Sequence, residues 1–302
     1  MRKIIECIPN FSTSDPKVVE AILDEIRCIQ NVRLLDYTFD GYYNRLVVSF
    51  VGDEDSVLQA ALNSAIKAID LIDMNRHKGQ HPRLGAVDVV PFAPIRNATM
   101  EDCVELAKAF GRRLAEAHHI PVYLYGEAAS RPDAEDIDWV RQGEYEGLHE
   151  MIKRPGREPD FGPKEPHPTA GATIVGARRI MVGFNVNLGT TNLEVAKRVA
   201  RAVHARKGGL TDVRAMALMI PEKDMTQIGI SIGDFKKTPL YRVLELVKTE
   251  AERYGVPIVG AEFCGLVPLQ VLIDVAKYYL KVEELEEDRI IEIGVRKALD
   301  QT

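Results

Sequence analysis

Hydrophobic residues follow two alternating spacings through the first half of the chain. Short apolar runs rich in β-branched residues are typical of strands. Between them, apolar residues recur three and four positions apart, as on one face of a helix. Asp15 with Pro16 suits the start of the first helix, and Thr99 suits the start of the third. The predicted strands are 3–8, 32–37, 46–51, 86–91 and 121–125, and the predicted helices are 16–26, 56–72 and one that starts at 99.

The second half of the chain repeats this order of elements. Both halves have the order β-α-β-β-α-β with additional elements, which is that of a ferredoxin-like unit. We therefore predict an α/β (α+β) fold of two such subdomains, each a sheet with helices packed on one face. A ligand groove is expected between the two sheets, because pockets prefer interfaces between domains. The elements of the second half are strands 180–187, 213–219, 227–232 and 257–261, and helices that start at Asn192 and Thr238.

Residues 142–173 separate the two halves and have little periodicity. Five prolines between 155 and 168 interrupt the segment. A connection of this length inside a compact chain is usually functional or disordered. Phe161, Thr169 and Ala170 favour an ordered part after Pro159. The alternative is a simple tether between domains.

Composition narrows the class of protein. The 302 residues carry 39 basic and 45 acidic side chains, a net charge of −6 with neutral histidines. Hydrophobic residues make up 46% and charged residues 28%, which excludes wholesale disorder. The acidic balance argues against a nucleic-acid-binding protein, although it allows a local basic pocket for a small anion.

The sequence does not predict export or insertion into a membrane. Glu6 and Pro9 interrupt the first apolar run, and no stretch of 18 apolar residues follows. The four cysteines, at 7, 28, 103 and 264, are too widely spaced for a disulfide framework or a zinc cluster, and we expect buried free thiols. The protein is therefore expected in the cytoplasm, without a membrane partner.

Residues 74–85 concentrate the candidate chemistry. The segment holds two histidines, two arginines and one lysine among twelve residues, between a predicted helix and a predicted strand. Histidine suits proton transfer at neutral pH, and the neighbouring bases could hold carboxylates. Metal binding is a weaker alternative: His77 and His81 are four positions apart, but Gly79 and Pro82 disfavour a regular helix. Two exposed histidines without a role are another alternative.

Polar residues at other element ends are further candidates. Asp36 and Asp40 lie where two predicted strands meet, followed by Asn44 and Arg45. A carboxylate there could orient an imidazole, or it could serve the turn of a hairpin. Nothing in the sequence resembles a phosphate-binding loop.

Matching runs along nearly the whole chain resemble the glutamate formimidoyltransferase (formiminotransferase) family. Their order as well as their residues agrees, so the resemblance is to a family rather than to one motif. The runs are ECIPNFS at 6–12, LIDM at 71–74, RHKGQHPR at 76–83, PVYLYGEA at 121–128, DFGP at 160–163, GAT at 171–173, GAR at 176–178, FNVN at 184–187, VG at 259–260 and GLVPL at 265–269.

The resemblance implies two α/β subdomains, 1–178 and 179–302, and a homodimer. In animal relatives this unit is fused to a helical cyclodeaminase. No such domain is expected within these 302 residues, so we do not expect two activities to be coupled within the chain.

The resemblance also implies a site. His81, in the His-Pro-Arg run, corresponds to the catalytic histidine, and no metal is expected. Thr38 stands where some relatives carry Asp, so Asp36 or Asp40 would have to serve as its acidic partner. Ala170 stands where animal members carry an aromatic residue. The folate-contacting stretch falls on Gly162, Pro163, Lys164, Glu165, Pro166, His167, Pro168, Thr169, Ala170 and Gly171. Other substrate-binding candidates are Asn10, Asp36, Asp40, Asn44, Arg76, His77, Arg83, Tyr125, Glu127, Arg178, Asn185 and Asn187.

The implied reaction moves a formimino group from N-formimino-L-glutamate to N5 of tetrahydrofolate, a co-substrate, giving 5-formiminotetrahydrofolate and L-glutamate. The attacking amine loses a proton and the departing nitrogen gains one, so a neutral imidazole can act first as base and then as acid. One alternative is a glutamate N-formyltransferase that uses 5-formyltetrahydrofolate. Others are a folate-binding protein without catalysis and an interaction scaffold.

Overall fold

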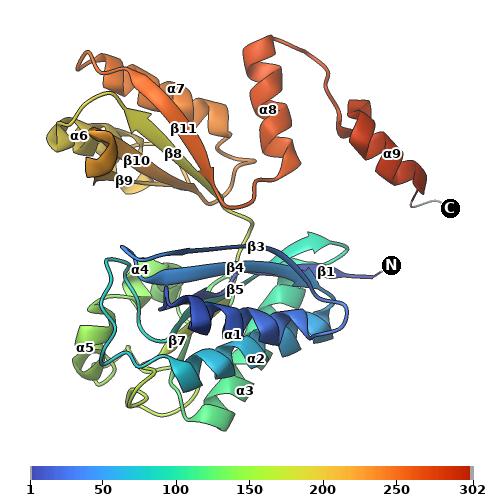
Figure 1. Cartoon of the computed structure of the whole chain (residues 1–302), viewed down its shortest axis with the longest axis vertical. Helices are drawn as coiled ribbons and strands as arrows, with labels where there is room; N and C mark the ends of the chain where they lie inside the picture. Colours follow the sequence, from blue (N-terminus) through green and yellow to red (C-terminus); the bar gives the residue numbers. More distant parts are fainter. Residues whose placement is uncertain (1, 300–302) are drawn as a thin grey trace. The chain divides into compact units, whose positions relative to one another are not determined.

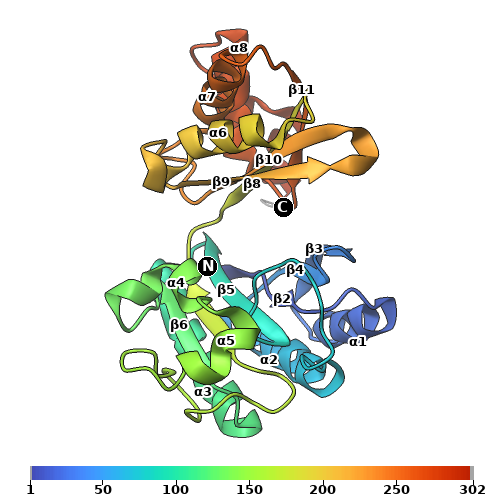
Figure 2. The ribbon, with the colours of Figure 1, turned by 90° about the vertical axis from the view of Figure 1, so that its left-hand side faces the viewer.

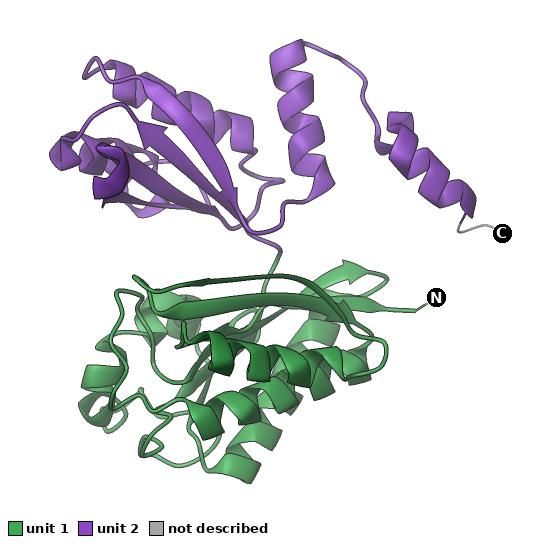
Figure 3. Cartoon of the chain, viewed as in Figure 1, with its two compact units in different colours: residues 1–179 green, residues 180–302 purple. Residues whose placement is uncertain are grey.

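The chain forms two compact units, residues 1–179 and 180–302 (Figures 1 and 3). The computed structural model describes residues 2–299. The first unit carries a seven-stranded sheet and the second a four-stranded sheet. The mixed α/β fold predicted from the sequence is confirmed.

The sheet of the first unit contains the predicted β-α-β-β-α-β order and extends it. β1 and β2 are separated only by Ile8 and Pro9, and both lie between β4 and β5. β3 borders β4, while β7 and then β6 continue the sheet in parallel beyond β5. The strands are β1 (Ile4–Cys7), β2 (Asn10–Phe11), β3 (Arg33–Asp40), β4 (Arg45–Gly52), β5 (Val87–Arg96), β6 (Val122–Gly126) and β7 (Thr173–Ala177).

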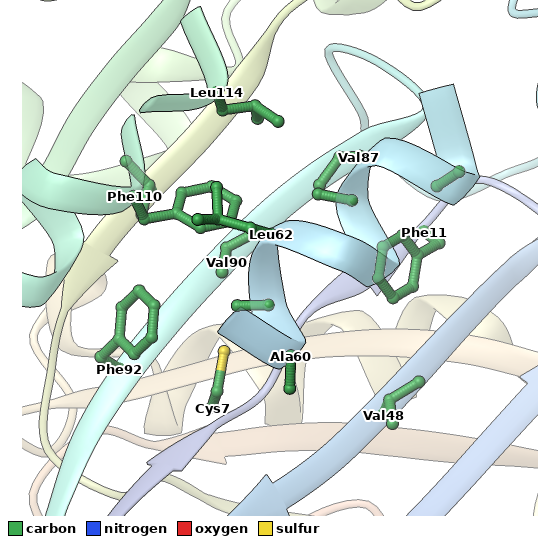
Figure 4. Close-up of a cluster of buried hydrophobic side chains, with 14 of the residues drawn as sticks. Cys7, Phe11, Val48, Ala60, Leu62, Val87, Val90, Phe92, Phe110 and Leu114 are labelled. Atoms are coloured by element: carbon green, nitrogen blue, oxygen red, sulfur yellow. The ribbon is translucent and has the colours of Figure 1, made fainter. Parts of the chain in front are cut away.

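Three long helices cover one face of this sheet: α1 (Pro16–Arg27), α2 (Glu54–Leu71) and α3 (Met100–His118) (Figure 1). Phe11, Phe92 and Phe110 are fully buried between the helices and the strands (Figure 4). Burial of such side chains is the main favourable contribution to the stability of the unit.

The predicted starts of α1 and α3 are confirmed. Asp15 Oδ1 accepts a hydrogen bond from Lys17 N at 2.8 Å, with Pro16 in the first helical position. Thr99 Oγ1 accepts from Asp102 N, and Asp102 Oδ2 accepts from Thr99 N, a complete capping box. These bonds satisfy backbone N–H groups that a helix start leaves without partners.

Short helices cover the opposite face of the sheet near β6 and β7 (Figure 2). They are η1 (Pro132–Glu135), α4 (Ile137–Val140) and α5 (Glu144–Met151), so the segment 142–173 begins with a helix that the sequence analysis missed. The part after Pro159 is ordered, as predicted: Val122 N donates to Phe161 O at 2.9 Å, and Leu124 N donates to Asp160 Oδ2 at 2.7 Å.

The second unit has the ferredoxin-like arrangement predicted for it. Its antiparallel sheet has the order β11-β8-β10-β9, with α6 and α7 packed together against it. Val186, Ile230 and Val199 belong to its buried core. The elements are β8 (Val182–Leu188), α6 (Leu193–Val203), η2 (Ala205–Lys207), β9 (Val213–Ile220), η3 (Pro221–Lys223), β10 (Met225–Ile232), α7 (Leu240–Glu252), β11 (Ile258–Cys264), α8 (Leu269–Leu280), η4 (Glu287–Arg289) and α9 (Ile291–Leu299).

Two of the four cysteines differ from the expectation. Cys7 and Cys103 are buried free thiols, whereas Cys28 and Cys264 are exposed. Cys28 follows the end of α1 and Cys264 ends β11, so neither faces a core. Within residues 2–299, no helix combines the length and the apolar character that crossing a membrane requires.

We predict that Phe50→Ala lowers the free energy of unfolding by about 3–5 kcal/mol, because Phe50 is fully buried in β4 and its loss leaves a cavity. Phe39→Ala, on the neighbouring β3, is the matched control, since Phe39 is 42% exposed. Urea unfolding of both variants provides the comparison. Equal losses for the two would contradict this description of the core.

Candidate active site

The histidine loop, residues 72–86, connects α2 to β5 and is held by backbone hydrogen bonds on two sides. On one side, Gln80 N donates to Tyr42 O, in the turn between β3 and β4, at 3.3 Å. On the other side, Met74 N donates to Thr169 O at 2.8 Å. The loop is therefore fixed between the hairpin and the stretch that precedes β7.

Both ring nitrogens of His77 form hydrogen bonds within the protein. Its Nε2 lies 3.0 Å from Asn44 O, to which it donates, and its Nδ1 accepts from Arg83 Nε at 3.3 Å. These partners assign the neutral ring with its proton on Nε2. Burial lowers the pKa of His77, which favours the same neutral form. His77 therefore supports the loop rather than presenting a free nitrogen.

Arg83 joins the histidine loop to α5. Its side chain is 6% exposed and donates to both carboxylate oxygens of Glu146, at 2.8 and 2.6 Å. It also donates to Glu144 at 3.1 Å. The hydrogen bonds from Arg83 hold the pKa of Glu146 below its usual range. The guanidinium is thus fully compensated by carboxylates of the protein.

A pocket of about 490 Å³ opens beside this ion pair, a size typical of small-molecule sites. His81 does not line this pocket; it lines a second, tighter cavity, too narrow for a water molecule, that shares His77 and Arg83 with the pocket. The pocket is lined by His77, Lys78, Gly79, Gln80, Arg83, Gly143, Glu144 and Glu146. The tighter cavity is lined by Phe11, Ser12, Tyr43, Asn44, Arg45, His77, His81, Arg83 and Asp88.

His81 stands between a guanidinium and a carboxylate. Its Nε2 lies 2.9 Å from Arg45 Nη1, and its Nδ1 lies 4.0 Å from Asp88 Oδ2. A guanidinium can only donate, so Nε2 accepts and the proton of the neutral ring is on Nδ1, toward Asp88. Burial, followed by the charges of Arg45, Arg141 and Arg83, lowers the pKa of His81 to about 2. The imidazole is therefore neutral at physiological pH.

Asp88 is the carboxylate beside His81, rather than Asp36 or Asp40. Its side chain is 2% exposed, and its oxygens accept from the Arg141 guanidinium and from Leu84 N. The 4.0 Å to His81 is too long for a direct hydrogen bond. Asp88 and Arg141 thus form a buried ion pair directly behind the imidazole.

The two aspartates proposed from the sequence lie on β3. Asp40 Oδ1 accepts from Tyr43 N at 2.8 Å, which is the turn chemistry that the sequence left open as an alternative. Asp40 is also the cross-strand neighbour of Arg45, and Asp36 lies opposite Ser49 on β4.

Other predicted residues fall into two groups. Asn10 and Asn44 belong to the site: Asn10 Oδ1 accepts from Arg45 Nη1 at 3.3 Å, and Asn44 Nδ2 donates to Lys78 O at 2.9 Å. Arg76 does not, since its side chain is exposed and pairs with Asp73 at 3.4 Å.

Tyr125, Glu127 and Arg178 lie around the ends of β6 and β7. Tyr125 is buried in the apolar cluster that covers these strands, and Glu127 is exposed. Arg178 Nη1 donates to Arg179 O at 3.0 Å. None of these three is among the described residues that line the pocket or the tighter cavity.

Asn185 and Asn187 belong to a polar network in the second unit. They alternate along β8 with the buried Val186, so they lie on the face of the sheet opposite α6 and α7. Gln227 Nε2 donates to Asn187 Oδ1 at 2.8 Å and to Glu262 Oε1 at 2.9 Å. Asn185 Nδ2 donates to the same Glu262 oxygen at 3.4 Å.

The stretch 162–171 is an ordered turn. His167 Nδ1 accepts from Ala170 N at 3.0 Å and from Thr169 N at 3.3 Å. His167 and Gly171 also exchange backbone hydrogen bonds. Ala170 is fully buried. The side chains of this stretch that face solvent are those of Lys164, Glu165, Pro168 and Thr169.

The residues that surround His81 were not predicted from the sequence. Asp88 follows it by only seven positions, but Arg141 comes from α4's C-terminal end and Glu144 and Glu146 from α5. One signal was present: Asp88 interrupts an otherwise apolar strand, where an unpaired charge would be costly.

Family models and known proteins match the chain over nearly its whole length. Residues 4–178 match the family model of the formiminotransferase domain, N-terminal subdomain, and residues 183–300 match that of the formiminotransferase domain. Glutamate formimidoyltransferase of Thermoplasma acidophilum is 46% identical over 298 residues, covering 98% of both chains. Its counterpart from Streptococcus pyogenes serotype M1 is 42% identical, covering 95% of this chain and 96% of its own. Formimidoyltransferase-cyclodeaminase of Mus musculus is 42% identical, covering 99% of this chain and 57% of its own.

The lowered pKa of His81 predicts acid sensitivity of the fold. Below about pH 6.5 the unfolded chain binds a proton on this imidazole while the folded protein does not, so stability falls by about 1.4 kcal/mol per pH unit. We expect His81→Gln to reduce this slope between pH 6 and 4 in urea unfolding. His149→Gln is the control, since His149 is exposed. Equal slopes for the wild type and His81→Gln would contradict the buried neutral imidazole.

Proposed function

The chain belongs to the formiminotransferase family, and we propose that it transfers the formimino group of N-formimino-L-glutamate to N5 of tetrahydrofolate, with His81 moving the proton. The products are 5-formiminotetrahydrofolate and L-glutamate. One observation carries the role of His81: Nδ1 of its neutral ring faces a buried carboxylate, so the lone pair on Nε2 can act as a base.

The transfer conserves protons overall. N5 attacks the formimino carbon, and its proton passes to His81 Nε2 as the new C–N bond forms. The bond between that carbon and the glutamate nitrogen then breaks, and the imidazolium returns the proton to the departing nitrogen. A positioned base of this kind contributes roughly 10²–10⁴-fold in rate, and holding two substrates together contributes up to about 7–11 kcal/mol.

Asp88 and Arg141 support this proton transfer. The carboxylate of Asp88 would stabilise the positive charge that His81 acquires between the two steps, as in other histidine–carboxylate pairs. The ion pair with Arg141 keeps the carboxylate oriented within the protein. The distance of 4.0 Å leaves room for the ring to approach when the site is filled.

Both substrates carry carboxylates, and several bases around His81 could bind them. Lys78 lines the pocket of about 490 Å³. Arg45 lies against His81 itself. Arg83 is less suitable, because two glutamates already neutralise it.

We place the folate against the stretch 162–171. Hydrogen bonds from Met74 N to Thr169 O and from Asn75 Nδ2 to Pro168 O hold that stretch beside the histidine loop. Because Ala170 is buried, the contacts would come from its exposed neighbours.

We further propose a cytoplasmic homodimer whose two formiminotransferase subdomains are residues 1–178 and 179–302. Tetrahydrofolate serves as co-substrate, and no metal, nucleic acid or membrane takes part. Within residues 2–299, no cluster of three or more His, Cys, Asp or Glu side chains is arranged to hold a metal ion. The family membership supports the folate co-substrate, and the acidic composition argues against a nucleic-acid partner.

We predict that His81→Ala loses turnover by about 10²–10⁴-fold while it keeps its fold and its affinity for folate, because the substitution removes the proton carrier alone. Steady-state formimino transfer and folate titration measure the two effects. His149→Gln is the control for replacing an exposed histidine. Unchanged turnover of His81→Ala would remove His81 from the mechanism.

Donor choice is tested by assaying formimino transfer from N-formimino-L-glutamate beside formyl transfer between 5-formyltetrahydrofolate and glutamate. We expect the formimino donor to give the higher kcat/KM. A higher kcat/KM with the formyl donor would indicate a glutamate N-formyltransferase. Folate binding without a single turnover of either donor would indicate a binding protein.

A further inference from the structure

Arg45 differs in its partners from Arg83 and Arg141, the other two arginines around His81. Arg83 pairs with Glu144 and Glu146, and Arg141 pairs with Asp88. The Arg45 side chain makes its hydrogen bonds with the described part of the chain through Nη1 alone, and no carboxylate of that part forms an ion pair with it.

The partners of Arg45 are neutral. Nη1 donates to Asn10 Oδ1 at 3.3 Å and to His81 Nε2 at 2.9 Å, and the guanidinium carbon lies 5.9 Å from the centre of the Tyr43 ring. Burial and the neighbouring Arg141 lower the pKa of Arg45, and the carboxylates of Asp88 and Asp40, which act in the opposite direction, offset this only in part. A half-buried guanidinium that no carboxylate contacts directly is a strong site for a planar carboxylate, which it can bind through two parallel hydrogen bonds.

The contact with His81 also blocks the proposed chemistry. The Nε2 lone pair must accept the proton of the attacking amine, yet in this arrangement it accepts a hydrogen bond from Arg45. The same guanidinium places a positive charge beside the ring that has to become positive. Arg45 therefore has to turn away from Nε2 before the ring can work as a base.

We propose that Arg45 binds a carboxylate of the glutamate donor, and that this ion pair draws the guanidinium away from His81 Nε2, so that the base is uncovered only when the donor is present. This inference rests on the proposed function of His81. It makes Arg45 both a substrate-binding residue and a positioning residue for His81, and it gives selectivity for donors that carry a carboxylate.

The charges around His81 fit this exchange. The groups that face the ring are Arg45, Arg141, Arg83, His77 and Asp88. Arg141 and Arg83 are already paired and His77 is neutral, so Arg45 is the cation whose effect a bound carboxylate can cancel. Neutralising it raises the pKa of His81 toward its ordinary value and makes the ring a stronger base.

Nitrogen NMR of the imidazole tests the exchange without turnover. In ligand-free protein we expect the Nε2 signal of His81 to be that of a hydrogen-bonded acceptor, unprotonated down to pH 4. Saturating L-glutamate should move this signal toward that of an Nε2 that accepts no hydrogen bond from Arg45, and should shift the titration of His81 to higher pH. In Arg45→Met, we expect the Nε2 signal of a nitrogen without the Arg45 hydrogen bond already in the absence of glutamate. Adding glutamate should not change that signal further. Arg33→Met, on the exposed edge strand β3, is the matched control and should behave as the wild type.

Kinetics provide a second readout. The natural donor is compared with a donor whose carboxylates are converted to amides, and the preference is the ratio of their kcat/KM values. We expect Arg45→Met to lower this preference for the carboxylate donor by about 10–100-fold. Arg45→Lys should keep part of that preference, because it retains the charge but not the planar fork.

The outcomes separate this inference from the proposed function. If glutamate leaves the His81 signal of the wild-type protein unchanged while His81→Ala still loses turnover, the role of Arg45 is wrong and that of His81 stands. If His81→Ala retains turnover, the proposed mechanism itself is wrong. The wild-type titration decides the first point even if Arg45→Met does not fold.

Discussion

The contact between Arg45 and His81 is the interaction on which this account depends. It joins a half-buried cation, with which no carboxylate of residues 2–299 forms an ion pair, to the neutral lone pair that the chemistry requires. Behind the ring, Asp88 forms an ion pair with Arg141, and Asp88 Oδ2 lies 4.0 Å from the opposite nitrogen, Nδ1. The imidazole is therefore in direct contact with Arg45 and has a carboxylate on its other side, and Arg45 is the cation that an anionic ligand can neutralise.

The β3–β4 hairpin and the histidine loop bring Arg45 and His81 into contact. The β3–β4 hairpin places Arg45 at the start of a strand whose alternate residues are buried, so its side chain lies on the face opposite the three long helices. The histidine loop packs closely against that hairpin. A Cβ at Gly79 would lie 2.3 Å from Tyr43 O, so only glycine fits at this position. Elements more than thirty residues apart in sequence thus meet at His81.

Much of the fold could be predicted because it rests on local signals. Periodic apolar positions and caps such as Thr99 give the order of elements, and that order indicates the ferredoxin-like arrangement. The short helix α5 was missed because its flanks, with Gly143 before it and a proline-rich run after it, are typical of a loop. In the site, the resemblance to a family pointed to His81, but the pairing of Arg83 with Glu146 across 63 positions has no local signal. The groove expected between the two sheets and the role of the stretch 162–171 stay predictions.

The most direct test is a crystal structure of the protein with a non-reactive folate analogue and L-glutamate bound together. The account predicts that N5 of the folate lies within about 2.6–3.2 Å of His81 Nε2, with the Arg45 guanidinium on a glutamate carboxylate. A complex in which both ligands are bound while Arg45 still covers Nε2, or in which the pterin lies away from His81, would contradict it.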